Sequence, residues 1–313
     1  MTDRPEVPDV VVAAVDIGGT KTAAALVTRS GQLVARASAP TPGVAGADAI
    51  LQTAADLVLR LRAGSAAPIV RALGVGSAGV VDAATGFVLG ATEVLRGWAG
   101  TDLRGSLASA TGLPTAVVND VHAHAIGEAR RGAAHGAATV LFVGVGTGIG
   151  GSFVLDGAPL PGAHSAAGHI GHQPSPYAGK LTCTCGGTGH LEAVAAGPTL
   201  RAEYERRSGA TVSDLRAVAA LAADGDPFAV DTIVLGGTAV GSAVGGLVNV
   251  LDPHVVVVGG GVANLGELWW GALRAAVRRE ALPSLVGVTV VPASLGADAA
   301  LVGAAEIAWE TMT

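Results

Sequence analysis

The sequence predicts an α/β chain that folds into two lobes. Short runs rich in Val and Ala, which are typical of buried strands, alternate with longer segments of helical spacing. Several of these runs end directly in glycine turns, and 47 glycines are spread over the 313 residues. The order of elements changes at Asn119–Asp120, where we expect the hinge between the lobes.

The first lobe is expected to begin with strands. The run D-V-V-V-A-A-V at 9–15 predicts a buried strand that ends at Asp16. Glycine turns separate it from expected strands at 22–27 and 32–37, so we predict an antiparallel start rather than a strand-to-helix, dinucleotide-binding opening. Apolar residues at helical spacing predict a helix over 47–63. Three more elements are expected before the hinge: a strand at 70–76, a helix at 101–111 and a strand at 114–119.

Helices become more frequent after the hinge. The patterns predict a helix at 121–131, strands at 138–145 and 150–155, a largely helical region from 189 to about 250, a strand at 255–262 that runs into a glycine turn, a helix at 265–280, a strand at 287–291 and a last helix at 298–310. The last helix is apolar enough to pack back on another lobe. We therefore expect a small N-terminal lobe of 1–119 plus 297–313, and a large C-terminal lobe of 120–296.

Charge and cysteine content limit the partners and the compartment. A net charge of −6 without a Lys/Arg cluster argues against a nucleic-acid partner, which needs a basic face. Residues 1–8 lack the apolar core of a secretory signal peptide. The charge-free run at 232–251 fits a membrane span or a buried helix, and its glycines favour the buried helix, so no membrane partner is expected. A disulfide between Cys183 and Cys185 would be strained, which favours a reducing cytoplasm.

The first motif is the turn D-I-G-G-T-K, which runs from Asp16 to Lys21. Without a Cβ, Gly18 and Gly19 let backbone N–H groups close on a phosphate. Thr20 adds a hydroxyl, and Asp16 is a candidate holder of Mg²⁺ through water. The alternative is a plain hairpin turn, for which G-G is a common choice.

Two further glycine turns follow strands in the second lobe. The segment G-V-G-T-G-I-G-G at 144–151 contains Gly146, Thr147 and Gly148 and leads into a strand, which favours a second phosphate-binding hairpin over a dinucleotide site. Gly259 and Gly260 follow a buried strand and are candidates for contact with a nucleotide base or ribose. Each turn alone has a purely structural alternative, and three together favour nucleotide binding.

An Asn-Asp pair ends the strand before the hinge. One interpretation is that Asp120 caps the helix that follows it. The functional interpretation is that Asp120 is a general base and that Asn119 hydrogen-bonds the same polar substrate.

Histidines and both cysteines gather between residues 164 and 192. His172, Cys183, Cys185 and His190 have the identity and number that tetrahedral zinc prefers. A site closed by four protein ligands is structural, since catalytic zinc keeps an open position. His169 and Glu192 are then polar groups that the metal places for substrate recognition, the alternatives being a surface histidine and a solvated residue in the first turn of a helix.

Together these motifs resemble the ROK family of sugar kinases. The matching segments occur in the family's order across about residues 10 to 305: D-I-G-G-T-K at 16–21, N-D at 119–120, G-T-G-I-G-G at 146–151, G-H at 171–172, the cysteine cluster at 183–190 and V-V-G-G at 257–260. The resemblance implies an actin-like, ribonuclease-H-type two-lobe fold with a structural zinc loop, which closes over ATP and a hexose. It also implies Mg²⁺ as a cofactor and a homodimer.

The resemblance assigns roles by position. Asp120 matches the base that accepts a proton from the 6-hydroxyl of the sugar, and Asp16 matches the residue associated with Mg²⁺. The glycine turns match the loops that hold the phosphates of ATP. The positions expected to bind the sugar are Gly79, Asn119, Asp120, His169, His172 and Glu192, of which His172 is also a zinc ligand.

Three departures from the family pattern bear on the substrate. His169 stands where many members have Glu, and the resulting A-G-H-I-G-H resembles bacterial N-acetylmannosamine kinases. His190 replaces the usual last cysteine and remains a zinc ligand type. Val94 stands before L-R-G-W, where the family often has Asn, and removes an expected sugar contact.

N-acetylmannosamine is therefore the predicted substrate, because neutral His offers one donor, one acceptor and more apolar surface than Glu. A glucokinase or another hexose kinase is the alternative, and a non-catalytic sugar-binding protein ranks lower. A sugar-responsive repressor is not expected, since only 15 residues precede Asp16 and a DNA-binding domain needs more.

Overall fold

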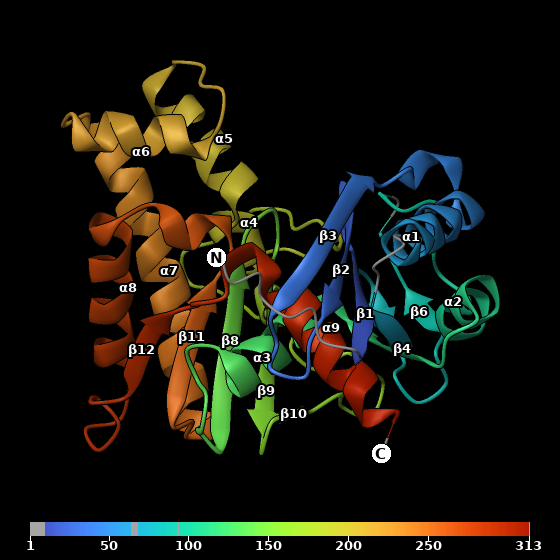
Figure 1. Cartoon of the computed structure of the whole chain (residues 1–313). Coiled ribbons are helices and arrows are strands. Elements are labelled where there is room, and N and C mark those ends of the chain that lie inside the picture. Colours follow the sequence, from blue (N-terminus) through green and yellow to red (C-terminus); the bar gives the residue numbers. More distant parts are fainter. Residues whose placement is uncertain (1–9, 64–67, 93, 313) are drawn as a thin grey trace, which may run out of the picture. The chain divides into compact units, whose positions relative to one another are not determined.

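The computed structural model describes residues 10–63, 68–92 and 94–312. The chain divides into two compact units, each with its own sheet and core. The first unit comprises Met1–Gly136, Gly157–Ala167 and Ala297–Thr313, and the second comprises Ala137–Asp156 and Gly168–Gly296. Figure 1 labels the elements of both units.

The first unit is built on a mixed sheet with the strand order β3-β2-β1-β4-β7. Strands β1 (Val10–Ile17), β2 (Lys21–Val27) and β3 (Leu33–Pro40) pair antiparallel. Strands β4 (Ile69–Ser77) and β7 (Thr115–Asn119) continue the sheet parallel to β1. The predicted antiparallel start is confirmed, because the turn at Gly18–Gly19 joins two paired strands.

Alternation along β1 gives this sheet two apolar faces. Val11 and Val15 belong to the core under α1 (Ala47–Arg62) and α2 (Leu103–Thr111), together with Leu57. Val12 and Ala14 point the other way and pack with Leu301 of α9 (Ala299–Glu310). The C-terminal helix thus covers the second face of the first sheet, as its apolar composition predicted.

The helix α3 (Asp120–Arg131) also belongs to the first unit. It lies close against α9, because a Cβ added to Gly127 would come within 2.3 Å of the Ala299 oxygen and one added to Gly303 within 1.8 Å of the Ala123 oxygen. The compact units therefore divide after Gly136 rather than at the Asn119–Asp120 junction, where the sequence pattern changes. The remaining elements of this unit are the short pieces η1 (Gly43–Ala45), β5 (Val80–Val81), β6 (Val88–Gly90) and β10 (Ala158–Pro159). The short helix η4 (Gly296–Asp298) begins with the last residue of the second unit and ends in the first.

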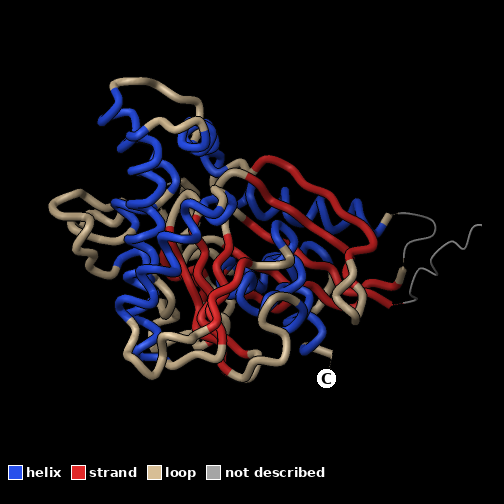
Figure 2. The backbone as a smooth tube through the Cα atoms, turned by 90° about the vertical axis from the view of Figure 1, so that its left-hand side faces the viewer, coloured by secondary structure: helices blue, strands red, loops and turns tan. Residues whose placement is uncertain are grey.

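The second unit has a sheet in which β9, β8, β11 and β12 are neighbours in that order. Strands β8 (Thr139–Val145) and β9 (Ile149–Leu155) form an antiparallel hairpin, and β11 (Val255–Gly259) lies parallel to both β8 and β12 (Thr289–Pro292). Figure 2 follows these strands and the helices around them. The helical elements are η2 (Ile170–His172), α4 (Glu192–Ala195), α5 (Gly197–Ser208), α6 (Leu215–Ala223), α7 (Pro227–Leu251), η3 (Gly261–Asn264) and α8 (Glu267–Glu280).

Within the described part of the chain, α7 is the one helix long and apolar enough to cross a membrane by length and composition, with a mean hydropathy of 1.6 over its most apolar window. Its glycines press it against α8. A Cβ on Gly237 would lie 2.3 Å from the Trp269 oxygen, and one on Gly241 would lie 2.2 Å from the Leu273 oxygen. This packing makes α7 a core helix of the second unit, as the glycines in the run 232–251 predicted.

Candidate active site and metal centre

The parallel strands of the first sheet end together and bring the predicted acidic residues to one edge. Ile17 of β1 pairs with Ser77 of β4, and Ser77 pairs with Asn119 of β7. Asp16, near the end of β1, and Asp120, just beyond β7, therefore lie at the carboxyl ends of the two parallel strands that flank β4. Ligand sites of α/β sheets form at such edges.

Asn119 both begins α3 and holds the neighbouring carboxylate. Its side-chain oxygen accepts hydrogen bonds from the backbone N–H groups of Val121 and His122, at 2.9 and 3.2 Å, which makes Asn119 the helix cap. Its amide nitrogen donates to the Gly79 oxygen at 2.8 Å and to Oδ1 of Asp120 at 2.9 Å. Capping, which the sequence offered as an alternative role for Asp120, is thus performed by Asn119.

Asp16 and Asp120 influence each other electrostatically. Burial raises the pKa of Asp16 to about 7, with a further increase from the negative charge of Asp120 and a smaller decrease from Lys21. A divalent cation bound beside the two carboxyls would offset their mutual repulsion and favour the ionised form of Asp16. Carboxylate oxygen is also a preferred ligand of Mg²⁺.

The first glycine turn is tied down by a residue that the sequence did not single out. The Gly18 backbone N–H donates to the Lys21 oxygen at 3.0 Å. Thr41, directly after β3, donates its hydroxyl hydrogen to the Gly18 oxygen at 2.8 Å. The side chain of Val94 lies close above the turn, since a Cβ on Gly19 would be 3.1 Å from it. No local pattern marks Thr41, because its role depends on the pairing of β2 with β3.

The glycine turns of the second unit lie side by side. Gly259 of β11 pairs with Gly144 of β8, so the turns that follow these parallel strands meet at the same edge of the sheet. Gly260 has a φ of +90°. A Cβ at Gly260 would lie 2.3 Å from the Val145 oxygen. Both the backbone angle and the close approach require glycine here.

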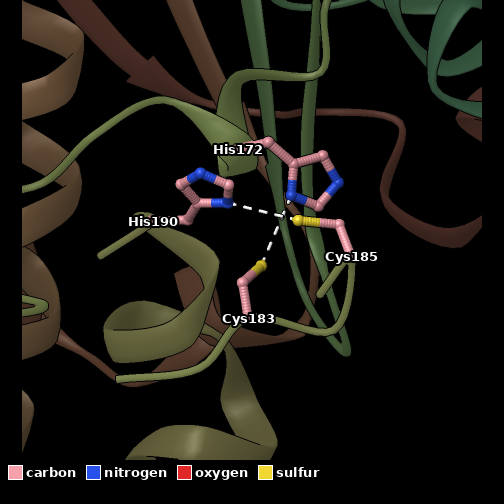
Figure 3. A group of neighbouring side chains, drawn as sticks. All are labelled: His172, Cys183, Cys185 and His190. Carbon is pink, nitrogen blue, oxygen red and sulfur yellow. Dashed lines mark hydrogen bonds between the residues drawn. The ribbon is translucent and has the colours of Figure 1, made fainter. Parts of the chain in front are cut away.

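The four predicted metal ligands converge within the second unit. The donor atoms of His172, Cys183, Cys185 and His190 all lie within 4.8 Å of one another (Figure 3). Nδ1 of His172 is 3.5 Å from Sγ of Cys183, and Nδ1 of His190 is 3.2 Å from Sγ of Cys185. Ligands at the edges of a zinc tetrahedron are about 3.3–3.8 Å apart. The number, type and spacing of these donors therefore fit a structural zinc ion.

Backbone hydrogen bonds connect parts of the loop that carries these ligands, residues 172–191, which we call the metal loop. The Cys183 N–H donates to the Gly187 oxygen at 2.8 Å, and the Gly186 N–H donates back to the Cys183 oxygen at 2.9 Å. The Leu191 N–H donates to the Gln173 oxygen at 3.0 Å, which joins the two ends of the loop. Burial raises the pKa of the Cys183 thiol, so metal binding would displace a proton from it.

His169 and Glu192 differ in their surroundings. His169 is exposed and its ring stacks on that of His172, with centroids 6.1 Å apart. Glu192 is 9% exposed, and one of its carboxylate oxygens accepts a hydrogen bond from the Ile149 N–H at 2.8 Å. The other oxygen accepts one from the hydroxyl of Thr184. Glu192 is therefore no solvated helix residue, and these two contacts were not foreseen from the sequence.

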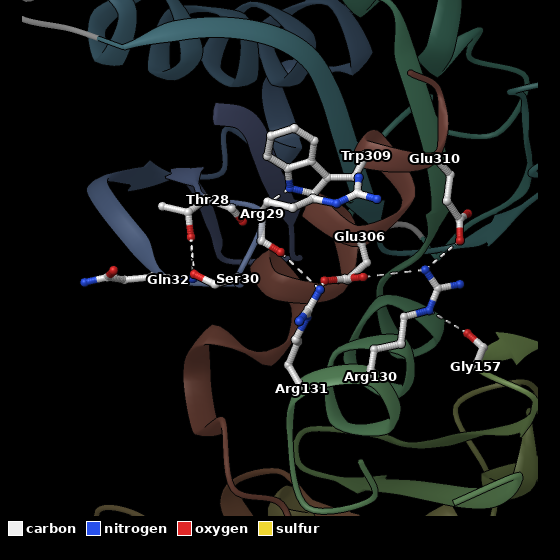
Figure 4. A network of polar contacts seen from close by, with 10 residues as sticks. All are labelled: Thr28, Arg29, Ser30, Gln32, Arg130, Arg131, Gly157, Glu306, Trp309 and Glu310. Carbon is white, nitrogen blue, oxygen red and sulfur yellow. Dashed lines mark hydrogen bonds and ion pairs between the residues drawn. The ribbon is translucent and has the colours of Figure 1, made fainter. Parts of the chain in front are cut away.

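The helix that carries Asp120 is anchored at its far end by a charged network (Figure 4). Arg130 pairs with Glu310 at 2.6 Å and Arg131 with Glu306 at 2.6 Å, so both arginines of α3 bind α9. Nε of Arg130 also donates to the Gly157 oxygen at 2.8 Å. Arg130 and Glu306 are the better shielded members of this network, and Glu310 is exposed. The shielded pairs are screened less by solvent than exposed pairs.

The predicted site residues thus fall into two groups, one in each unit. The first group is Asp16, Gly18, Gly19, Thr20, Lys21, Gly79, Asn119 and Asp120. The second group is Gly146, Thr147, Gly148, His169, His172, Cys183, Cys185, His190, Glu192, Gly259 and Gly260. Each group gathers around the strand ends or the metal loop of its own unit.

The chain is similar to named proteins along nearly its whole length. A sequence model of the ROK family matches residues 12–311. The glucokinase of Halalkalibacterium halodurans is 32% identical over 309 residues, which are 92% of each chain. The N-acetylmannosamine kinase of Escherichia coli is 33% identical over 296 residues, 94% of this chain and 97% of the relative. The crystal structure of a ROK family glucokinase from Streptomyces griseus in complex with glucose and AMPPNP is 32% identical, with a TM-score of 0.82 and a match that covers 96% of this chain and 99% of that chain.

Proposed function

Because the chain belongs to the ROK family, we propose that it transfers the γ-phosphate of ATP to the 6-hydroxyl of N-acetylmannosamine. The chain is an ATP-dependent sugar kinase of the actin-like fold, as the named kinases that match it along nearly its whole length show.

We assign the role of general base to Asp120 because of how its carboxylate is held. Its Oδ1 is fixed by two donors, the amide of Asn119 and the Val121 N–H, both at 2.9 Å. A carboxylate held in this way is suited to accept the proton of the sugar 6-hydroxyl as O6 attacks the γ-phosphorus. The O6–P bond forms while the bond from phosphorus to the bridging oxygen breaks, and ADP leaves with that electron pair.

The glycine turns are assigned to the nucleotide. In the first unit Gly18, Gly19, Thr20 and Lys21 would contact the phosphates, with Asp16 holding Mg²⁺. In the second unit Gly146, Thr147 and Gly148 would contact phosphate, and Gly259 and Gly260 the ribose or base. When bound, Mg²⁺ neutralises part of the phosphate charge. This assignment is supported by the place of Asp16 near the end of β1, directly before the glycine turn.

We assign a structural zinc ion to the cluster of two cysteines and two histidines in the metal loop. Its ligands are His172, Cys183, Cys185 and His190, whose donor spacing fits a closed tetrahedral site. The zinc would hold the ring of His172 in place beside His169 for sugar recognition. Gly79, Asn119, Asp120 and Glu192 complete the proposed set of sugar contacts.

The assignment of N-acetylmannosamine as the substrate depends on His169. An exposed imidazole that stacks on a fixed neighbour offers an apolar edge to an acetamido methyl group as well as one hydrogen bond. A glutamate at this position would instead accept hydrogen bonds from two adjacent hydroxyls. The 33% identity to the N-acetylmannosamine kinase of Escherichia coli is in line with this assignment.

Glucose is the second candidate substrate. It is favoured by the 32% identity to glucokinases, one of which has been solved with glucose and AMPPNP. We further propose that the kinase acts in the cytoplasm as a homodimer, with a sugar and ATP as its partners and neither nucleic acid nor membrane among them. The net charge of −6 supports the exclusion of nucleic acid.

The experiment that tests the substrate assignment compares the wild type with His169→Glu. Initial rates of ADP release are measured with N-acetylmannosamine and with glucose. We expect His169→Glu to shift the ratio of kcat/KM toward glucose by about tenfold or more, as expected for exchanged polar contacts in a pocket. An unchanged ratio, with both proteins folded and zinc-loaded, would remove His169 as the basis of the assignment.

A further inference from the structure

One carboxylate joins the metal loop to the second glycine turn. Thr184, which lies between the two cysteine ligands, donates its hydroxyl hydrogen to Oε1 of Glu192. Oε2 of the same carboxylate accepts the backbone N–H of Ile149 at 2.8 Å. Ile149 begins β9 immediately after the turn Gly146–Gly148. Three residues therefore connect the metal ligands to the turn.

This connection is closely packed. A Cβ added to Gly148 would lie 2.7 Å from Oε2 of Glu192, and Glu192 itself is buried. On the other side of the metal loop, a Cβ added to Gly171 would lie 2.3 Å from the Ile149 oxygen. A buried carboxylate that loses one of its donors must move or regain a partner, because leaving it unsatisfied is costly.

We propose that metal binding at the Cys/His group and nucleotide binding at the glycine turn are positively coupled through Thr184, Glu192 and Ile149. The inference rests on the proposed function, since it takes zinc and ATP as the two ligands. A metal that binds Cys183 and Cys185 fixes Thr184 between them, and the Thr184 hydroxyl then orients Glu192. The carboxylate in turn holds the Ile149 N–H, and with it the turn that the proposed function assigns to phosphate.

Thermodynamic linkage makes the coupling reciprocal. If zinc strengthens nucleotide binding by some factor, bound nucleotide strengthens zinc binding by the same factor. Couplings of this kind are typically about 5- to 150-fold, and for a connection of two hydrogen bonds we expect about tenfold. The zinc affinity of the protein can thus report on the glycine turn without any measurement of catalysis.

The test measures the apparent zinc affinity of the full-length protein by competition with a chromogenic chelator, with and without saturating magnesium AMPPNP. Thr184→Val removes the hydroxyl while keeping the shape of the side chain, and Thr184→Ser restores it. Thr182→Val is the matched control, because Thr182 is an exposed threonine of the same loop, one residue before Cys183. Zinc content and AMPPNP affinity are measured first for every protein.

We expect AMPPNP to raise the zinc affinity of the wild type, Thr184→Ser and Thr182→Val about tenfold, and that of Thr184→Val less than twofold. A wild type that binds both ligands with no mutual effect overturns the coupling and leaves the proposed function intact. Coupling that persists in Thr184→Val overturns the route. A protein that binds no zinc, or no AMPPNP, overturns the coupling together with the proposed function.

Discussion

The side-chain amide of Asn119 donates to Oδ1 of Asp120 at 2.9 Å while its oxygen caps the helix that Asp120 begins. One side chain thus both starts α3 and orients the proposed base. The same amide nitrogen donates to the Gly79 oxygen at 2.8 Å, so the turn that follows β4 and the start of α3 are held together at this point. The two functions of Asn119 can be separated by mutation.

Asn119→Ser keeps an oxygen for the cap and removes the amide donor. We expect a decrease in kcat of about 10- to 100-fold because the Asp120 carboxylate is no longer fixed. The free energy of unfolding should fall by no more than about 1 kcal/mol, since serine is a good helix cap. Steady-state kinetics and urea unfolding measure the two effects. Asn119→Ala loses the helix cap as well, so its free energy of unfolding should be about 1 kcal/mol lower than that of Asn119→Ser. A wild-type kcat in Asn119→Ser would contradict the orienting role.

Asp120→Asn should reduce kcat by about 10²- to 10⁴-fold, the usual contribution of a general base. Sugar affinity, measured by calorimetry, should change little, because the amide is isosteric with the carboxylate. Asp102→Asn is the control: Asp102 caps α2 by accepting the Gly105 N–H at 2.8 Å, and asparagine caps equally well. If Asp120→Asn turned over as fast as this control, another group would have to be the base.

The raised pKa of Asp16 makes folding stability depend on pH. Folded Asp16 holds its proton up to about pH 7, whereas the unfolded carboxyl loses it near 3.8. Between these values the folded state binds more protons, so the free energy of unfolding falls as the pH rises. For Asp16 alone the fall is about 2 kcal/mol from about pH 5.5 to about pH 8.

Urea unfolding of the wild type and Asp16→Asn in magnesium-free buffer isolates this contribution. The stability of the wild type relative to the variant should decrease over that range of pH. Saturating magnesium AMPPNP should oppose the decrease, because a ligand that binds only the folded state stabilises it. Parallel pH profiles for the two proteins would mean that Asp16 titrates normally.

We expect the protein to retain its zinc when His190 is replaced by another zinc ligand, and to lose it when His190 is replaced by a residue that cannot bind zinc. We expect purified wild type and His190→Cys to contain about one zinc per chain, and His190→Ala to lose most of its zinc and several kcal/mol of stability. Elemental analysis and thermal unfolding measure these outcomes. His164→Ala, at an exposed histidine outside the metal group, is the control. Full zinc content in His190→Ala would remove His190 from the ligand set.

Local patterns predicted most of the elements. Buried Val-rich runs located β1, β8 and β11, and the helical spacing over 47–63 located α1, because strand and helix periods leave clear traces in an apolar core. The metal group was also predictable, since few roles other than metal binding bring both cysteines of a chain together with histidines.

Contacts between segments that are distant in the sequence were harder to predict. The link from Thr41 to Gly18 depends on strand pairing, and the link from Glu192 to Ile149 joins positions 43 residues apart. The placement of α3 with α9 depends on Gly127 and Gly303, whose backbones approach closely only once both helices have formed. Neither hydrophobic periodicity nor motif spacing carries this information.

The substrate of this kinase can be identified from the rates of ADP release with different sugars. kcat/KM is measured for the zinc-loaded wild type with N-acetylmannosamine, glucose, N-acetylglucosamine, mannose and fructose at saturating magnesium ATP. We expect the highest kcat/KM for N-acetylmannosamine, with the phosphate on O6 of the product. Turnover of glucose without turnover of N-acetylmannosamine would contradict the substrate assignment.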